Sequence, residues 1–192
     1  GAPPRRFALK TVRWTFFRGV GFGRGALVAD LRDDGPKPWF APVDVSLKVR
    51  GDNSGRIMVD GTGTQAVGGL AFEGHAEWGP GARGGARLRL GPIHIAPDAD
   101  WRARALPGFT AIDSVAGDFE AMGEAVRDRK GTRGRGVLQI KDGAIAAAGI
   151  TAGGIDATLN ASLLSPLVLP PPQHIRIDTL DVGVPLRNVA LN

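Results

Sequence analysis

The chain of 192 residues contains no cysteine and no tyrosine, and aromatic residues make up only 6% of it. The absence of cysteine excludes disulfides, thiol nucleophiles and Cys-ligated metals. No stretch approaches the roughly 18 consecutive apolar residues that a membrane-spanning helix requires. The chain also lacks an initiator methionine and ends on the strand-like "NVALN". We therefore expect residues 1–192 to be one β domain, cut from a longer protein.

Acidic residues are fewer than basic ones, which gives a formal net charge of +5 and favours anionic partners. The acids and bases alternate along the chain, so a mildly basic, solvated surface is the simpler interpretation. The basic stretch "RDRKGTRGRG" at 127–136 has no aromatic neighbours on which bases could stack. We predict a solvated hairpin tip there and no nucleic-acid partner.

The dominant pattern is an alternation of apolar and polar residues with a period of two, which is typical of strands with one buried face. It is clearest in "PVDVSLKVR", "LAFEGHAEW", "ARLRL" and "IDATLNASL". The apolar positions of these segments include Val43, Val45, Leu47, Val49, Leu70, Phe72, Leu88, Leu90, Ile155, Leu159 and Leu163. Consecutive antiparallel strands follow from this pattern, which predicts a mainly β fold.

Glycine (29 residues) and proline (14 residues) are abundant and supply turn signals between these segments. Hairpin turns are predicted at 51–56, 59–63, 79–85 and 141–144. Helical patterns are scarce. The segment 118–129 is the best helix candidate, although Gly123 interrupts it and the same letters fit a strand. A single helical turn is expected after Pro97.

No arrangement of residues predicts catalysis, a metal or a cofactor. The three histidines His75, His94 and His174 lie far apart at outward positions. No carboxylate is matched with a second acid or base as hydrolysis would require. The glycine-rich "GVGFGRG" at 19–25 lacks the Lys-Ser/Thr ending of a nucleotide-binding loop and predicts a β-turn. We expect a protein that is not an enzyme.

A sheet with one apolar face must cover that face with a second sheet, by closure into a barrel, or with an apolar ligand. Alternation alone does not separate these cases, and on periodicity a closed sandwich or barrel is the simplest solution.

Residues 88–191 change this balance, because they resemble the C-terminal region of YdbH-like proteins of the AsmA-like superfamily. The resemblance lies in "GITAGGIDATL", the "SPL" step, a proline-rich turn leading to Gln173, and a strand running into "DVGVPL". An older name for this region is the dicarboxylate transport domain. The chain departs from the pattern at "PPPQ", where a looser Pro-Gly-Gln turn is expected.

This resemblance implies an antiparallel, strongly curved sheet that forms an open, taco-like groove with few short helices. It implies phospholipid transport between the membranes of the Gram-negative envelope, in the periplasm, with an inner-membrane anchor outside this chain. The expected partners are phospholipid acyl chains, the remainder of the longer chain and an outer-membrane protein. The eleven apolar residues named above are the predicted lipid contacts. In this interpretation Pro170, Pro171 and Pro172 end one strand and lead into the next.

Two alternatives stay open. The same fold with its apolar face packed shut would be a scaffold or interaction module, and an isolated piece would dimerise to cover that face. A small dicarboxylate site would require convergent arginines, for which Arg87, Arg89, Arg102 and Arg104 are candidates.

Overall fold

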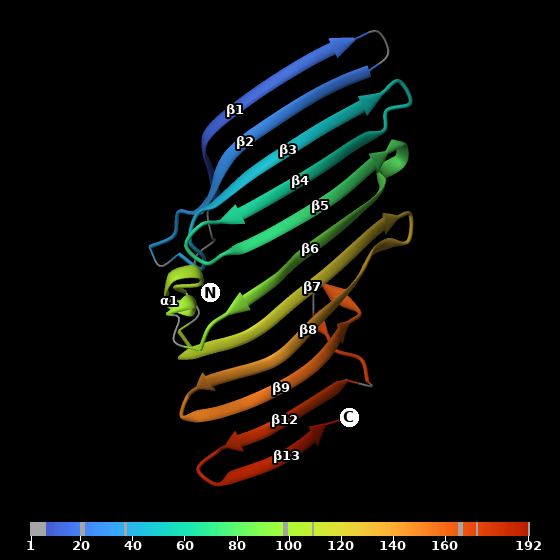
Figure 1. Ribbon diagram of the computed structural model, residues 1–192. Coiled ribbons are helices and arrows are strands. Elements are labelled where there is room, and N and C mark those ends of the chain that lie inside the picture. Colours follow the sequence, from blue (N-terminus) through green and yellow to red (C-terminus); the bar gives the residue numbers. More distant parts are fainter. Residues whose placement is uncertain are drawn as a thin grey trace.

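The protein is one long antiparallel sheet, as seen in a computed structural model that describes residues 7–19, 22–36, 38–97, 100–108, 110–164, 167–171 and 173–191. Eleven strands follow one another in the order β1-β2-β3-β4-β5-β6-β7-β8-β9-β12-β13 (Figure 1). Neighbours in the sheet are thus neighbours in the chain, apart from a short two-stranded hairpin that precedes β12. The mainly β fold class is confirmed.

The elements have the following bounds: β1 (Phe7–Gly19), β2 (Phe22–Asp33), β3 (Val43–Asp52), β4 (Ile57–Gln65), β5 (Leu70–Gly79), a 3₁₀ turn (Pro80–Ala82), β6 (Arg83–Ile95), α1 (Trp101–Ala105), β7 (Ser114–Asp128), β8 (Gly131–Ala147), β9 (Ile150–Ala161), β10 (Leu163–Leu164), β11 (Leu167–Val168), β12 (His174–Asp181) and β13 (Pro185–Leu191).

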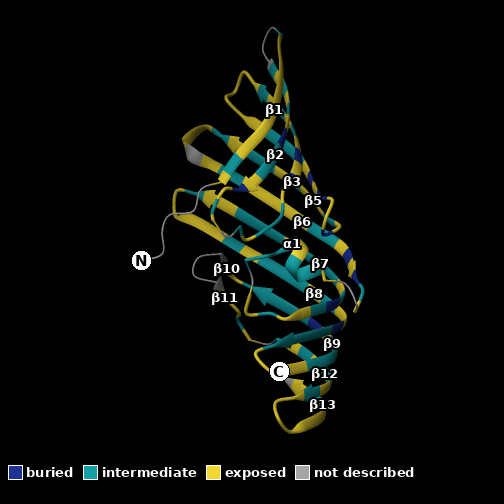
Figure 2. Cartoon of the chain, turned by 90° about the vertical axis from the view of Figure 1, so that its left-hand side faces the viewer, coloured by how far each residue is buried: buried dark blue, intermediate teal, exposed yellow. Residues whose placement is uncertain are grey.

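The sheet is curled but does not close. Among the described residues β1 and β13 each pair with a strand on one side only, and Figure 2 shows the sheet curling from β1 at one end to β13 at the other. A closed sandwich or barrel, the alternative that periodicity favoured, is therefore wrong. The open curled sheet expected from the family resemblance is the one found.

Irregular pairing marks four places in the sheet, and such bulges bend a strand and increase its twist. The register shifts between Lys10 and Arg13 in β1, between Leu90 and Ile93 in β6, and between Ala116 and Asp118 in β7. A further shift lies between residues 140 and 144 of β8. These bulges let a continuous sheet curl while keeping its alternation of faces.

Two kinds of local prediction are wrong. The helix candidate at 118–129 is part of strand β7, because pairing with both β6 and β8 outweighs its weak helical pattern. The turns predicted at 59–63 and 141–144 lie inside β4 and β8. Asp60-Gly61 continues the ladder, whereas Asp142 takes a positive φ of 49° at the bulge of β8. Asp-Gly pairs permit turns, and here neighbouring strands fix an extended chain instead.

The most buried residues gather at one margin of the sheet, under α1 and the loop between β2 and β3. Gln65 is 1% exposed, and its amide nitrogen donates to the carbonyl oxygens of Ala41 (3.0 Å) and Ala105 (3.1 Å). The indole nitrogen of Trp101 donates to the carbonyl of Gly68 at 2.6 Å. The single helical turn expected after Pro97 is thus real, and it covers the ends of the central strands.

The proline-rich segment connects β9 to β12 through the hairpin β10–β11. The side chain of Gln173 accepts from the backbone nitrogen of Asn160 (2.8 Å) and donates to its carbonyl (3.1 Å) and to the carbonyl of Pro170. The Gln173 amide thereby makes the two hydrogen bonds to Asn160 that a neighbouring strand would make. From His174 onward, β12 itself pairs with β9. The prolines were expected to end one long strand and lead into the next. The long strand β9 already ends at Ala161, and Pro170 and Pro171 instead follow the two-residue strand β11 and precede β12; Pro172 lies outside the described residues.

Candidate functional site

Strand pairing places the predicted apolar residues on a single face, which we call the apolar face. Residues paired directly across neighbouring strands share a face, so each row of partners can be followed across the sheet. One row runs Ala29, Val45, Gly63, Phe72, Leu90, Ala121, Leu138, Leu159. The next runs Leu27, Leu47, Gly61, Gly74, Leu88, Gly123, Gly136, Ala161.

A third row runs Phe16, Gly25, Val49, Val59, Ala76, Ala86, Ala125, Gly134. Val43, Leu70 and Ile155 follow the same alternation within β3, β5 and β9. The structure therefore brings all the predicted residues to this face except Leu163, whose side chain lies outside the described part. Their contact with lipid remains a prediction.

Glycines on the apolar face receive the large side chains of neighbouring strands. A Cβ placed on Gly63 would lie 2.0 Å from the ring of Phe72, and one on Gly61 would lie 2.6 Å from Leu47. Trp78 covers Gly84 in the same way, at 3.1 Å. Large side chains thus occupy the space that a side chain at these glycine positions would need. The signal was present in the sequence as glycines within the strand segments, but sequence reasoning gave those glycines no role in packing against large side chains.

The centre of the apolar face is hollowed where small residues line up. A cavity of about 400 Å³ is bordered by apolar-face residues that include Leu47, Val59, Phe72, Leu88 and Ala125. Leu88 is 52% exposed and Trp78 47% exposed, although both are large and apolar. Among the described residues the margin beside α1 is the most buried part of this face, and large apolar residues nearer the opposite margin are about half exposed (Figure 2).

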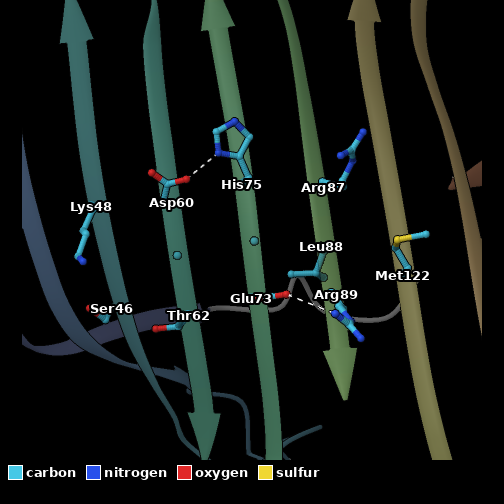
Figure 3. Close-up of a pocket in the computed structure, with 12 residues that line it drawn as sticks. Ser46, Lys48, Asp60, Thr62, Glu73, His75, Arg87, Leu88, Arg89 and Met122 are labelled. Atoms are coloured by element: carbon cyan, nitrogen blue, oxygen red, sulfur yellow. Dashed lines mark hydrogen bonds and ion pairs between the residues drawn. The ribbon is translucent and has the colours of Figure 1, made fainter. Parts of the chain in front are cut away.

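The opposite face is polar and carries ladders of ion pairs across the strands. Asp60 lies 2.7 Å from Arg50 and 2.7 Å from the Nδ1 of His75, which it faces in Figure 3. These two partners hold the pKa of Asp60 below its ordinary value. Arg89 is paired with Glu120 at 2.7 Å, and this raises the pKa of the guanidinium. Such a face is stable in water, and a second layer is not needed to cover it.

The other candidate sites do not assemble. Arg87 and Arg89 lie on the polar face of β6 beside carboxylates of the same sheet, whereas Arg102 and Arg104 belong to α1. The four arginines of the dicarboxylate alternative therefore do not form one site. His94 lies 2.7 Å from Asp118, and the described residues contain no group of three or more His, Cys, Asp or Glu side chains able to hold a metal.

These features define a class: an open antiparallel sheet with one charged face and one bare, hollowed apolar face. In the part of the chain that the structure describes, no helix is long and apolar enough to cross a bilayer. The family model YdbH-like, described as intermembrane phospholipid transport protein YdbH, matches residues 31–192. The chain belongs to this YdbH-like family, a family of lipid transport proteins.

The family match begins well before Leu88, where the resemblance argued from the sequence starts, and it includes most of the strands that build the apolar face. No curated protein and no solved structure matches the chain.

Proposed function

We propose that the apolar face binds the acyl chains of phospholipids without covalent chemistry, as one segment of a path between two membranes. The carrying observation is the rows of apolar residues and glycines that cross at least seven strands, with large members such as Leu88 about half exposed, on a sheet whose other face carries the ion pairs. In the full-length protein this segment would lie in the periplasm and be anchored to the inner membrane through a part outside this chain.

The energetics favour a hydrocarbon ligand. Each methylene group that leaves water for an apolar surface stabilises the complex by about 0.8 kcal/mol. The cavity is lined mainly by leucine, valine, phenylalanine, alanine and glycine, and the charged or polar residues along its border, His75, Arg87 and Glu124, belong to a row of the polar face. Such a lining suits a hydrocarbon chain better than a small polar ligand. The affinity would thus depend on the length of the acyl chain more than on any single contact. This suits a carrier that must also release its lipid.

The direct test uses two charge substitutions of equal exposure on neighbouring strands. Leu88→Asp places a carboxylate on the apolar face, where Leu88 is 52% exposed; Met122→Asp places one on the polar face, where Met122 is 53% exposed. We expect Leu88→Asp to weaken binding of a fluorescent phospholipid at least tenfold, because a charge facing hydrocarbon is strongly unfavourable. Met122→Asp should bind as the unaltered protein does.

Native mass spectrometry of the purified proteins, followed by lipid extraction, provides the second readout. Phospholipid should accompany the unaltered protein and the Met122→Asp variant in near-stoichiometric amounts and be lost from Leu88→Asp. Circular dichroism establishes that both variants keep their strands. Equal lipid content in all three proteins would reject the apolar face as the binding site, and an unaltered protein that never takes up lipid would favour the scaffold alternative.

A further inference from the structure

Charge is distributed unequally between the two margins at which the strands turn. We call the margin where β1, β3, β5 and β7 end the basic rim; it lies on the right of Figure 1, opposite α1. Its cations are Arg18, Arg24, Arg50, Arg56, Arg83, Arg127, Arg129, Lys130 and Arg133, and its anions are Asp52, Glu77 and Asp128.

The opposite margin has no such excess of cations among its described residues. Its anions are Asp33, Asp34, Asp44, Asp100, Asp113 and Asp181, and its cations are Lys10, which pairs with Asp34 at 3.4 Å, Arg32, Arg102, Arg104 and Arg187. Successive turns of the chain lie at alternate margins. The difference in charge between the margins is therefore contributed by many hairpins and depends on their side-by-side arrangement in the sheet.

The outermost row of the apolar face lies on the basic rim, and it contains two arginines. This row runs Arg18, Gly23, Gly51, Ile57, Trp78, Gly84, Arg127, Thr132. Arg127 is thus next to Trp78 across Gly84, which has no side chain to separate them. The row immediately inside it contains only apolar residues and glycine between Phe16 and Gly134. A cation therefore borders a surface of methyl and aromatic groups.

The carboxylates at this rim already have partners. Glu77 is bound by Arg56 at 2.9 Å, and Asp128 by Arg133 at 2.5 Å and by the backbone nitrogen of Lys130 at 2.7 Å. Arg83 and Arg127 have no carboxylate partner among the described residues. A hollow of about 390 Å³ lies here, bordered by residues of both faces that include Arg56, Trp78, Arg83 and Arg127 as well as Glu77 and Asp128. The rim thus has room and free donors for an anionic group.

We propose that the basic rim, through Arg127 on the apolar face and Arg83 on the polar-face side of the same hollow, binds the phosphate of phospholipids whose acyl chains lie on the apolar face. The guanidinium forms paired, charge-assisted hydrogen bonds with phosphate oxygens, and an indole such as Trp78 favours the boundary between hydrocarbon and polar groups. This inference rests on the proposed function and adds an orientation to it: chains toward the centre of the sheet and headgroups toward one margin. Phosphate contacts repeated along β1 to β8 would let headgroups move from one arginine to the next.

The test measures binding of a short-chain phosphatidylethanolamine and of the diacylglycerol with the same acyl chains. For the phosphatidyl lipid we expect Arg127→Gln to weaken binding about tenfold and the double variant Arg83→Gln, Arg127→Gln to weaken it further, since each lost hydrogen bond to a charged group has this effect. Binding of the diacylglycerol should stay the same, because it has no phosphate. Arg13→Gln, which removes an arginine from the polar face of β1, is the control of equal charge and should bind both lipids as before.

The outcomes separate the two proposals. If the unaltered protein binds both lipids and the Arg127 variants keep the same affinity ratio between them, the headgroup site is overturned and the apolar groove stands. If the unaltered protein binds neither lipid, the proposed function itself fails. Inorganic phosphate provides a third arm: phosphate alone binding as tightly as the phosphatidyl lipid would show a general anion site and would overturn a lipid headgroup as its ligand.

Discussion

At the scale of single residues, the apolar face depends on glycines, which have no side chain, as much as on large apolar residues. Phe72, Leu47 and Trp78 each lie over a glycine of the neighbouring strand. A side chain at those glycines would lift the large residue into the space that a lipid chain would occupy. Pairing of aromatic residues with strand glycines also compensates for the weakening that glycine causes in a sheet.

Gly63 and Gly51 offer a matched test of this role. A Cβ at Gly63 would lie 2.0 Å from Phe72, whereas one at Gly51 would lie 3.8 Å from its nearest neighbour, the carbonyl of Arg56. We expect Gly63→Ala to lower the free energy of unfolding by about 1 to 3 kcal/mol, since the ring must leave its position. Gly51→Ala should be neutral or raise it by up to about 1 kcal/mol by restricting the unfolded chain. Urea denaturation measures both, and equal effects would contradict the packing described.

At the scale of elements, α1 and the loop between β2 and β3 act as a fixed cover on one margin of the apolar face. Asp33 holds this loop by accepting from the backbone nitrogens of Gly35 and Trp39, both at 2.9 Å. The backbone nitrogen of Ala41 donates to the carbonyl of Ala105 at 3.0 Å, which joins the loop to α1. Gln65 lies beneath both and connects them to β4.

Gln65→Leu should loosen this cover while the sheet remains folded. Leucine has a similar size but donates no hydrogen bond, so the part-buried carbonyl of Ala41 and the buried carbonyl of Ala105 each lose a donor, at a cost of about 1 to 3 kcal/mol. Hydrogen exchange should accelerate at residues 41 and 101–106 and remain slow in β7 and β8. Gln139→Leu, on the exposed side of β8, is the control and should leave exchange unaltered. Faster exchange throughout the sheet would instead show that Gln65 supports the whole fold.

At the scale of the whole molecule, the open sheet leaves two faces with opposite requirements. The polar face is satisfied by water and by its ion pairs, while the apolar face exposes a contiguous surface of a kind that monomeric proteins rarely leave bare. Surfaces of this kind usually bind a ligand or a protein partner, and we expect a ligand or a second copy of the chain to cover this one.

Removal of lipid should change the state of the isolated chain. We expect the delipidated protein to self-associate through the apolar face and the lipid-loaded protein to be monomeric, as measured by analytical ultracentrifugation. A ligand that binds only the folded state adds about 2.7 kcal/mol to stability at a concentration one hundred times its dissociation constant. Reloading should therefore also raise the unfolding midpoint. A delipidated protein that is monomeric and equally stable would show that the face needs no cover.

The sequence predicted the strands best where alternation was strict. Val43 to Val49 and Leu70 to Trp78 lie in β3 and β5 with the expected face apolar. It failed where a local signal competed with strand pairing, as at Asp60-Gly61, which is inside β4, and at 118–129, which is β7. In both cases hydrogen bonds from strands on either side decide the conformation, and those partners are not local in the sequence.

By itself, the sequence determined that the strictly alternating segments have one apolar and one polar face, because side chains in a strand alternate with a period of two whatever the strand's neighbours. Only the tertiary structure decided that these faces join into one surface, that the sheet stays open, and that Arg127 lies in the same row as Trp78. Register, curl and the stacking of hairpins depend on contacts between strands. Which residues come together at the basic rim is therefore decided by those contacts and by no single segment of the chain.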